Sequence, residues 1–147
     1  MAIPATIVLP AKLESLYDFM GFVSSRAREQ GFSNERIGEI ELALEEILVN
    51  ISKYAYKDSG LDGEIEITCK IADEENFIIE ITNSGMPFDI FSSREPDIDA
   101  DIDKRQIGGL GIFFVKRLMD DVQYRREEGK NKLTLVIHKT NSSSNKK

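Results

Sequence analysis

The sequence predicts an α+β fold, a two-layer sandwich with a mixed, mostly antiparallel sheet and helices on one face. Two pairs of strand-like segments, 64–71 with 77–82 and 121–126 with 132–138, are each joined by a short turn. Strands joined in this way pair antiparallel. Amphipathic helical segments precede each pair, and their apolar stripes need a sheet to cover.

Composition indicates one globular domain, predicted over 1–140, followed by a disordered tail over 141–147. Hydrophobic residues make up 41% and charged residues 31% of the chain. The formal net charge of −7 argues against nucleic-acid binding, which needs a basic face, and favours a protein partner. No apolar run approaches the roughly 20 residues of a membrane span, and no signal peptide is recognisable, so we predict a cytoplasmic protein.

The first half of the chain predicts one strand and two helices. A strand over 2–10 ends at Pro10, and Gly31 suits the end of the following helix. Ser33 is a fair N-cap for a second helix, which is predicted to reach about Tyr56. The apolar residues at helical spacing in the first helix are Leu13, Leu16, Tyr17, Met20, Val23 and Ala27.

The second half predicts a strand pair, a long loop, a helix and a second strand pair. Cys69 falls on the apolar side of an alternating strand and is interpreted as a core residue. The acidic stretch 86–107 has the length of a lid. A helix then begins at a glycine-rich turn, with Ile112 and Val115 on its apolar face. His138 lies in the last strand without a second histidine or cysteine beside it and is interpreted as structural.

Asn50 is an unusual residue in the middle of a core helix, because asparagine is a mediocre helix former. At 100° per residue it falls on one margin of the apolar stripe, and Glu46, one turn earlier, lies just beyond it. The two side chains are therefore predicted neighbours at a pocket wall. The alternative is a solvated helix edge on which the spacing has no function.

Two glycine sites support a ligand-binding interpretation. Asn83 ends a strand, and Gly85 allows close approach of the backbone to a flat ligand, although a plain turn explains both residues equally. Three glycines within 108–111 precede a helix whose free N–H groups can receive phosphate oxygens. A structural turn would need only one of these glycines.

Together these segments resemble the GHKL ATP-binding family of gyrases, heat-shock chaperones, histidine kinases and MutL proteins. Glu46 and Asn50 match its first box, "NSGMP" at 83–87 its second, and "GGLG" at 108–111 its third. Thr134 on the last strand matches a threonine that helps to hold adenine in the family. Within the family, the chain looks most like bacterial anti-sigma factor serine/threonine kinases, which sequester a sigma factor and phosphorylate an anti-sigma factor antagonist.

The resemblance implies ATP and Mg²⁺ as cofactors and a role for each matched residue. Glu46 would be the general base and Asn50 a ligand of Mg²⁺. Gly108, Gly109, Leu110 and Gly111 would contact phosphates, and Asn83, Gly85 and Thr134 would contact the base. Lys104 and Arg105 could neutralise phosphate charge or simply be solvated.

The second box departs from the family, which has aspartate where this chain has Asn83. An amide oxygen can still accept a hydrogen bond from adenine, but it lacks the charge and the other end of the amide brings donors. A nucleotide-responsive module that binds a partner without phosphoryl transfer is therefore the alternative function. A small scaffold without a ligand is the third possibility. A homodimer is possible through the first helix or the open face of the sheet.

Overall fold

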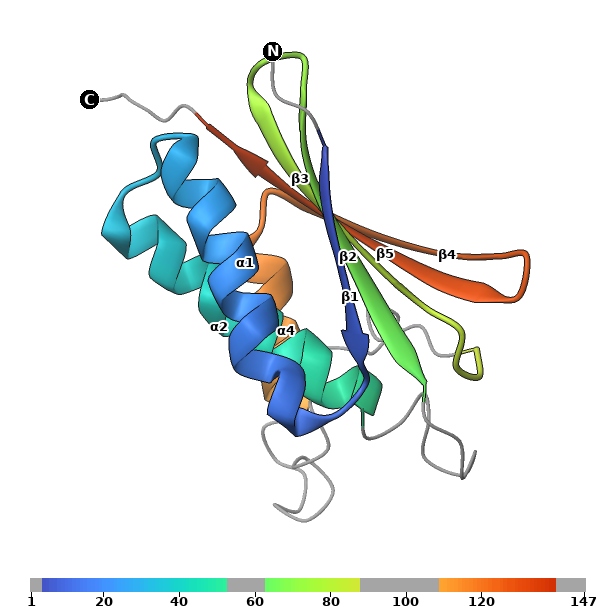
Figure 1. Ribbon diagram of the computed structural model, residues 1–147. Helices are drawn as coiled ribbons and strands as arrows, with labels where there is room; N and C mark the ends of the chain where they lie inside the picture. Colours follow the sequence, from blue (N-terminus) through green and yellow to red (C-terminus); the bar gives the residue numbers. More distant parts are fainter. Residues whose placement is uncertain (1–3, 53–62, 88–108, 140–147) are drawn as a thin grey trace.

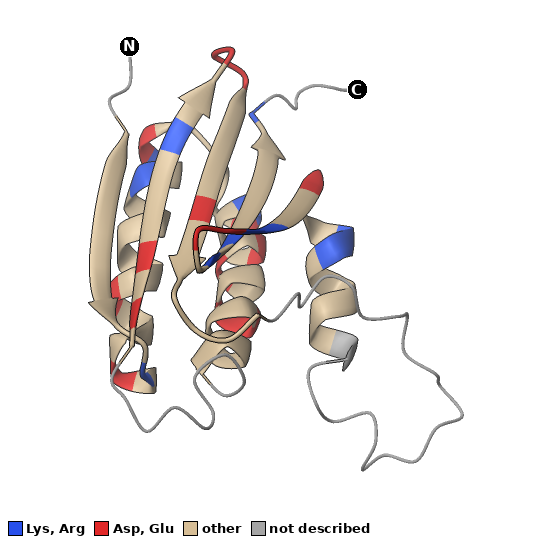
Figure 2. Ribbon diagram, turned by 90° about the vertical axis from the view of Figure 1, so that its right-hand side faces the viewer, with Lys and Arg blue, Asp and Glu red and all other residues tan. Residues whose placement is uncertain are grey.

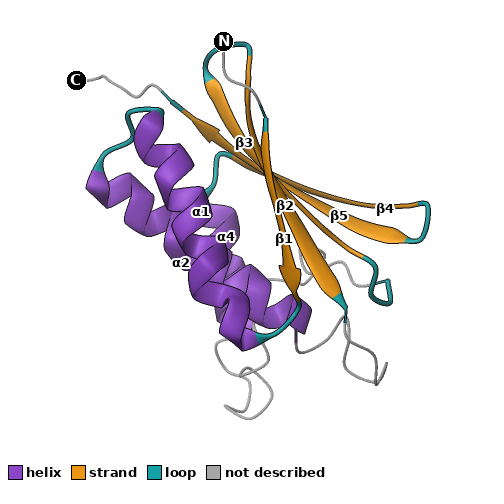
Figure 3. Ribbon diagram, in the orientation of Figure 1, coloured by secondary structure: helices purple, strands orange, loops and turns teal. Residues whose placement is uncertain are grey.

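The computed structural model of the chain describes residues 4–52, 63–87 and 109–139, with the backbone alone at 109 and 110. It contains one five-stranded sheet in the order β1-β2-β3-β5-β4, and every neighbouring pair of strands is antiparallel. Helices cover one face of this sheet (Figures 1 and 3). The predicted fold class is confirmed. The elements are β1 Ala5–Pro10, a 3-10 turn Leu13–Ser15, α1 Leu16–Glu29, α2 Asn34–Asn50, β2 Glu64–Ala72, β3 Asn76–Asn83, α4 Gly109–Leu118, β4 Asp121–Glu127 and β5 Lys130–His138.

Local signals in the sequence set the helix and strand boundaries. Gly31 follows α1 with φ of +90°, a conformation that glycine adopts without strain. Ser33 caps α2, and its hydroxyl accepts a hydrogen bond from the Arg36 N–H at 3.1 Å. The β2–β3 turn has positive φ at Asp73 and Glu74, as tight hairpins require.

The core lies between the helices and the inward face of the sheet. Alternate residues of β2, β3 and β5 point into it, and α2 contributes Ile40, Leu44 and Ile47. Cys69 is buried there, as predicted; Ile112 and Val115 form the buried face of α4, and Met119, directly after the helix, is buried as well.

The apolar face of α1 differs from the predicted one. The helical spacing predicts Tyr17 and Leu13 on this face, but Tyr17 is 81% exposed and Leu13 is exposed as well. The chain enters the helix only at Leu16, so the buried stripe runs through Phe19, Val23 and Ala27. Leu16 and Met20 pack against its edge.

The opposite face of the sheet is polar. Charged residues of both signs lie along its strands, which are nearest the viewer in Figure 2. Lys70 of β2 pairs with Glu80 of β3 at 3.2 Å, and Glu127 lies 3.6 Å from Lys132. Such cross-strand pairs indicate a solvated face.

Three predictions lie outside the described residues. The helix was expected to continue to Tyr56, but α2 is described only to Asn50, with Ile51 and Ser52 in a π-helical turn. The predicted lid over 86–107 is described only at its first two residues, and the tail over 141–147 is not described. The single domain over 1–140 with this tail stays a prediction.

Candidate functional site

The carboxyl-terminal half of α2 brings Glu46 and Asn50 together, as their spacing predicted. Asn50 is only 4% exposed, so it is not part of a solvated helix edge. Its Nδ2 donates to the Glu46 backbone oxygen at 2.7 Å and to Glu46 Oε2 at 2.9 Å. The amide thereby fixes the carboxylate at the margin of the core.

This arrangement also orients the amide of Asn50. Both hydrogen bonds are donated by Nδ2, so Oδ1 faces away from Glu46. Among the described residues, none donates a hydrogen bond to this oxygen. A buried amide oxygen without a donor is a suitable ligand for a hard cation.

Gly111, in the first turn of α4, packs directly against the Glu46 carboxyl group. A Cβ atom added to Gly111 would overlap the carboxyl carbon and both of its oxygens. Glycine is required here for close approach rather than for an unusual backbone conformation. The first turn of α4 is also the positive end of its helix dipole, which favours a negative charge beside it.

Arg36 holds the other end of α4. Its NH1 donates to the Leu118 carbonyl oxygen at 2.6 Å, and NH2 lies 3.2 Å from Asp120 Oδ2. Arg36 lies in the first turn of α2 and Leu118 ends α4, whereas Glu46 near the end of α2 meets Gly111 at the start of α4, so the two helices run antiparallel.

Asn83 lies at the end of β3, on the inward face, and is 3% exposed. Its Oδ1 accepts hydrogen bonds from the Gly85 N–H at 2.9 Å and from Asn131 Nδ2 at 3.0 Å. The residue therefore shapes the "NSGMP" turn as well as facing the interior.

Sequence reasoning did not identify Asn131, which is 1% exposed and pairs with Asn83 across β5 and β3. Its Nδ2 also donates to the Met86 oxygen at 2.9 Å, and its Oδ1 accepts from Tyr124 at 2.7 Å. Arg126 NH1 donates to Asn131 Oδ1 at 3.2 Å and to the Gly85 oxygen at 2.8 Å. The signal was available: Asn131 is a polar residue in register with the apolar side of an alternating strand.

Thr134 does not join this group. It lies in β5 three residues after Asn131, so the alternation of the strand puts the two side chains on opposite faces. Asn131 faces the helices, whereas Thr134 shares the polar face with Glu80, its partner in β3. Lys104, Arg105 and Gly108 lie outside the described residues, and the backbone at Gly109 and Leu110 opens α4.

The remaining candidate groups do not contribute acid–base or metal chemistry at this site. Burial raises the pKa of the Cys69 thiol to about 12, against a weak opposing effect of Arg26, so the thiol is un-ionised at neutral pH. His138 is exposed on β5, and its Nδ1 lies 2.6 Å from Asn76 Oδ1, in agreement with a structural role. No set of three or more acidic, histidine or cysteine side chains gathers within the described ranges.

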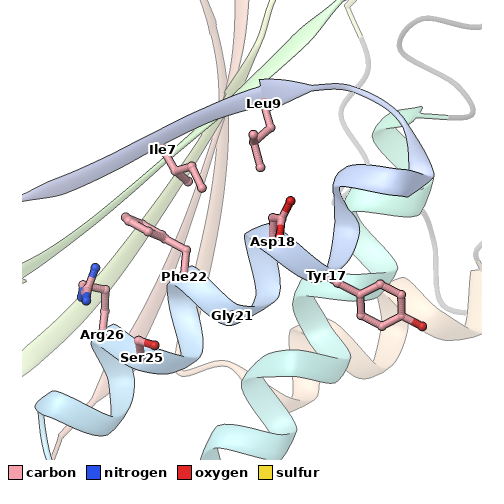
Figure 4. Close-up of a pocket in the computed structure, with 8 residues that line it drawn as sticks. All are labelled: Ile7, Leu9, Tyr17, Asp18, Gly21, Phe22, Ser25 and Arg26. Carbon is pink, nitrogen blue, oxygen red and sulfur yellow. The ribbon is translucent and has the colours of Figure 1, made fainter.

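A separate groove lies between β1 and α1 (Figure 4). Ile7 and Leu9 of β1 and Tyr17 and Phe22 of α1 are among the residues that line it. None of the described helices is long and apolar enough to cross a membrane.

Comparison with known proteins agrees with this geometry. The model of the histidine kinase-like ATPase domain family matches residues 9–137, and the chain belongs to that family. Its relatives include the serine-protein kinase RsbW of Listeria monocytogenes, 34% identical over 84% of this chain and 80% of the relative. The serine-protein kinase RsbW of Bacillus cereus is 30% identical over 82% of this chain and 76% of the relative. These names confirm the predicted class, an ATP-dependent protein serine kinase.

A solved structure shares the fold. The RsbU and RsbW domains of a Mycobacterium tuberculosis protein superpose with a TM-score of 0.64 at 16% identity. The match covers 92% of this chain and 32% of the other.

Proposed function

We propose that this protein transfers the γ-phosphoryl group of ATP to a serine of an anti-sigma factor antagonist, and that it also sequesters a sigma factor. Family membership and the names of the relatives support the kinase class. The observation that carries the proposal is the Glu46 carboxylate, held by Asn50 against the first turn of α4.

Glu46 is the proposed general base. The serine oxygen bonds to the γ-phosphorus as the bond from that phosphorus to the oxygen shared with the β-phosphate breaks, releasing ADP. Glu46 accepts the proton of the serine hydroxyl. The hydrogen bond from Asn50 Nδ2 holds one carboxylate oxygen and leaves Oε1 to accept the proton.

Asn50 is the proposed protein ligand of Mg²⁺. Its Oδ1 meets the requirement of a hard oxygen donor turned away from Glu46. When bound, Mg²⁺ supplies charge neutralisation between phosphate oxygens.

The backbone N–H groups of Gly109, Leu110 and Gly111 are proposed to bind the phosphates at the start of α4. Gly108, Lys104 and Arg105 are included in the proposal from the sequence alone. Asn83 and Gly85 are proposed to border the base. Thr134 is left out of this set because its strand register turns it to the other face.

The test is transfer of γ-labelled phosphate from ATP to a purified antagonist, with Mg²⁺, by the wild type and by Glu46→Gln. Glutamine keeps the size of the side chain but cannot accept the proton, so we expect transfer to fall about 100-fold or more with ATP still bound. Glu45→Gln is the matched control, because Glu45 is the exposed neighbour on the same helix. Undiminished transfer by Glu46→Gln would reject Glu46 as the base.

The alternative function is a module that binds a partner in response to nucleotide without transferring phosphate. Asn83 favours it, since the chain lacks the charged residue that the family uses at this position. ATP binding in calorimetry together with no label on the antagonist would support this alternative over the kinase.

We also propose a cytoplasmic location, as predicted from the sequence. The predicted homodimer also stays a prediction. Its candidate surface is the exposed side of α1 around Leu13 and Tyr17, beside the groove in Figure 4.

A further inference from the structure

The amide of Asn83 has a single allowed orientation. Its Oδ1 accepts hydrogen bonds from the Gly85 N–H and from Asn131 Nδ2. Rotating the amide by 180° would place Nδ2 against these two donors. The Gly85 N–H cannot change its role, because a backbone N–H only donates.

The orientation of Asn131 is fixed in the same way. Its Oδ1 accepts from Arg126 NH1, and a guanidinium has no acceptor. Its Nδ2 donates to the carbonyl oxygen of Met86, which has no hydrogen to give. Arg126 also donates to the Gly85 oxygen, so the β4–β5 hairpin is tied to the turn that follows Asn83. The network therefore runs in one direction from Arg126 through Asn131 to Asn83.

It follows that the terminal atom of Asn83 that is left over for a further contact is Nδ2, a donor. Among the residues that the structure describes, none offers an acceptor to this group. The side chain is nevertheless 3% exposed, and a buried N–H without a partner is destabilising by an amount comparable to a lost hydrogen bond. A ligand that brings an acceptor would remove this penalty.

We propose that Asn83 makes the base site select a 6-oxopurine nucleotide over an adenine nucleotide. This inference rests on the proposed function, in which Asn83 borders the base, and refines it: ATP is still the phosphoryl donor, but it binds more weakly than a 6-oxopurine nucleotide. Adenine carries an amino group at C6, and two donors would then face each other. A 6-oxopurine, such as hypoxanthine or guanine, carries an oxygen at the same carbon and accepts the hydrogen bond from Asn83 Nδ2.

The remaining contacts of Asn83 are compatible with either an asparagine or an aspartate at this position. The Gly85 N–H and Asn131 bind Asn83 Oδ1, which an aspartate oxygen would replace without loss. Asparagine and aspartate differ in charge and in the second terminal atom, which is a donor in asparagine and an acceptor in aspartate. Base selection therefore reverses at a single position while the turn keeps its contacts.

The experiment measures binding of ADP, inosine diphosphate and GDP to the wild type and to Asn83→Asp by titration calorimetry with Mg²⁺. Diphosphates avoid turnover, and inosine diphosphate differs from ADP only by the oxygen at C6 and the accompanying hydrogen on N1. For the wild type we expect inosine diphosphate to bind roughly tenfold more tightly than ADP. For Asn83→Asp we expect the order to reverse, and a cooperative thermal transition in the absence of nucleotide checks that the variant is folded.

Two results would overturn the inference. The first is tighter binding of ADP than of inosine diphosphate by the wild type, and the second is a preference that Asn83→Asp leaves unchanged. Both differ from a failure of the proposed function, which would appear as no binding of any diphosphate and no transfer from ATP. GDP separates the effect of the 6-oxo group from that of the 2-amino group. Tighter binding of both inosine diphosphate and GDP than of ADP supports the inference.

Discussion

The contact between Glu46 and Gly111 joins residues 65 positions apart in the sequence. Asn50 fixes the carboxylate from one side, and the glycine leaves room for it on the other. The "GGLG" segment therefore has a function beyond presenting N–H groups to phosphates: its last glycine accommodates the proposed base.

Gly111→Ala is predicted to impair phosphoryl transfer more than nucleotide binding. The added Cβ overlaps the carboxyl group of Glu46, and the flexible end of that side chain would have to leave Asn50. We expect the rate of transfer to fall at least tenfold at saturating ATP, with a small change in the dissociation constant of ADP.

Gly38→Ala is the control for this substitution. Gly38 lies in α2 with no atom within 4 Å of the added Cβ, so the change should leave transfer intact. It should also raise stability by about 0.5–1 kcal/mol, the usual gain of alanine over glycine in a helix. Equal rates of transfer for Gly111→Ala and Gly38→Ala would contradict the close approach of Glu46 to α4.

At the scale of a single element, β5 shows how the alternation of a strand selects functional residues. Asn131, Leu133 and Leu135 face the helices, and Lys132, Thr134 and Val136 face solvent. A hydrogen-bonding residue therefore contributes to the interior site only if it falls in the first set. Asn131 does, and Thr134 does not.

Substitutions at these two positions are predicted to have different effects. Thr134→Ala should leave nucleotide affinity within about twofold of the wild type, because the side chain lies on the far face of the sheet.

Asn131→Ala removes one of the two donors to Asn83 and the donor to the Met86 oxygen. We expect a loss of stability of about 1–3 kcal/mol in urea unfolding and weaker ADP binding in calorimetry. If Thr134→Ala binds ADP more weakly than the wild type while Asn131→Ala does not, Thr134 contacts the nucleotide and its assignment to the outer face is wrong.

At the scale of the whole molecule, the sheet brings the site together from three distant segments. β3 and β5 are neighbours although α4 and β4 lie between them in sequence. Arg36 ties α2 to the end of α4, so the core and the site depend on the same helix pair. A probe of global unfolding should therefore also report on the integrity of the site.

Burial of the Cys69 thiol predicts how the free energy of unfolding of the whole domain depends on pH. The thiol has an ordinary pKa of 9.0, and burial raises the pKa to about 12 in the folded protein. Between these values the unfolded chain binds fewer protons than the folded one, so the free energy of unfolding falls as pH rises. Below about pH 9 the thiol does not make the free energy of unfolding depend on pH. Above about pH 9 it lowers the free energy of unfolding by up to about 1.4 kcal/mol per pH unit.

The measurement is urea unfolding at intervals between pH 8 and 11, for the wild type and for Cys69→Ala. Lysines and tyrosines also titrate in this range, so only the difference between the two proteins reports on Cys69. A steeper loss of stability in the wild type is expected. Parallel pH profiles would show that the thiol is not buried in the folded state.

The sequence by itself determined the elements and much of the site. The strand alternation of 64–71, the Ser33 cap and the four-residue spacing of Glu46 and Asn50 are local patterns, and local geometry fixes what they form. The family boxes then assigned a kinase class that the relatives confirm. The alternation of β5 carried a signal for the inward position of Asn131, but the sequence prediction began that strand at Lys132 and the resemblance pointed to Thr134 instead.

Only the tertiary structure decided which distant groups meet. The pairing of Asn83 with Asn131, the contact of Gly111 with Glu46 and the exposure of Tyr17 depend on how sheet and helices pack. Hydrogen-bond direction is also a tertiary property. An asparagine in a sequence is both donor and acceptor, and the partners that occupy Oδ1 leave Asn83 with a donor.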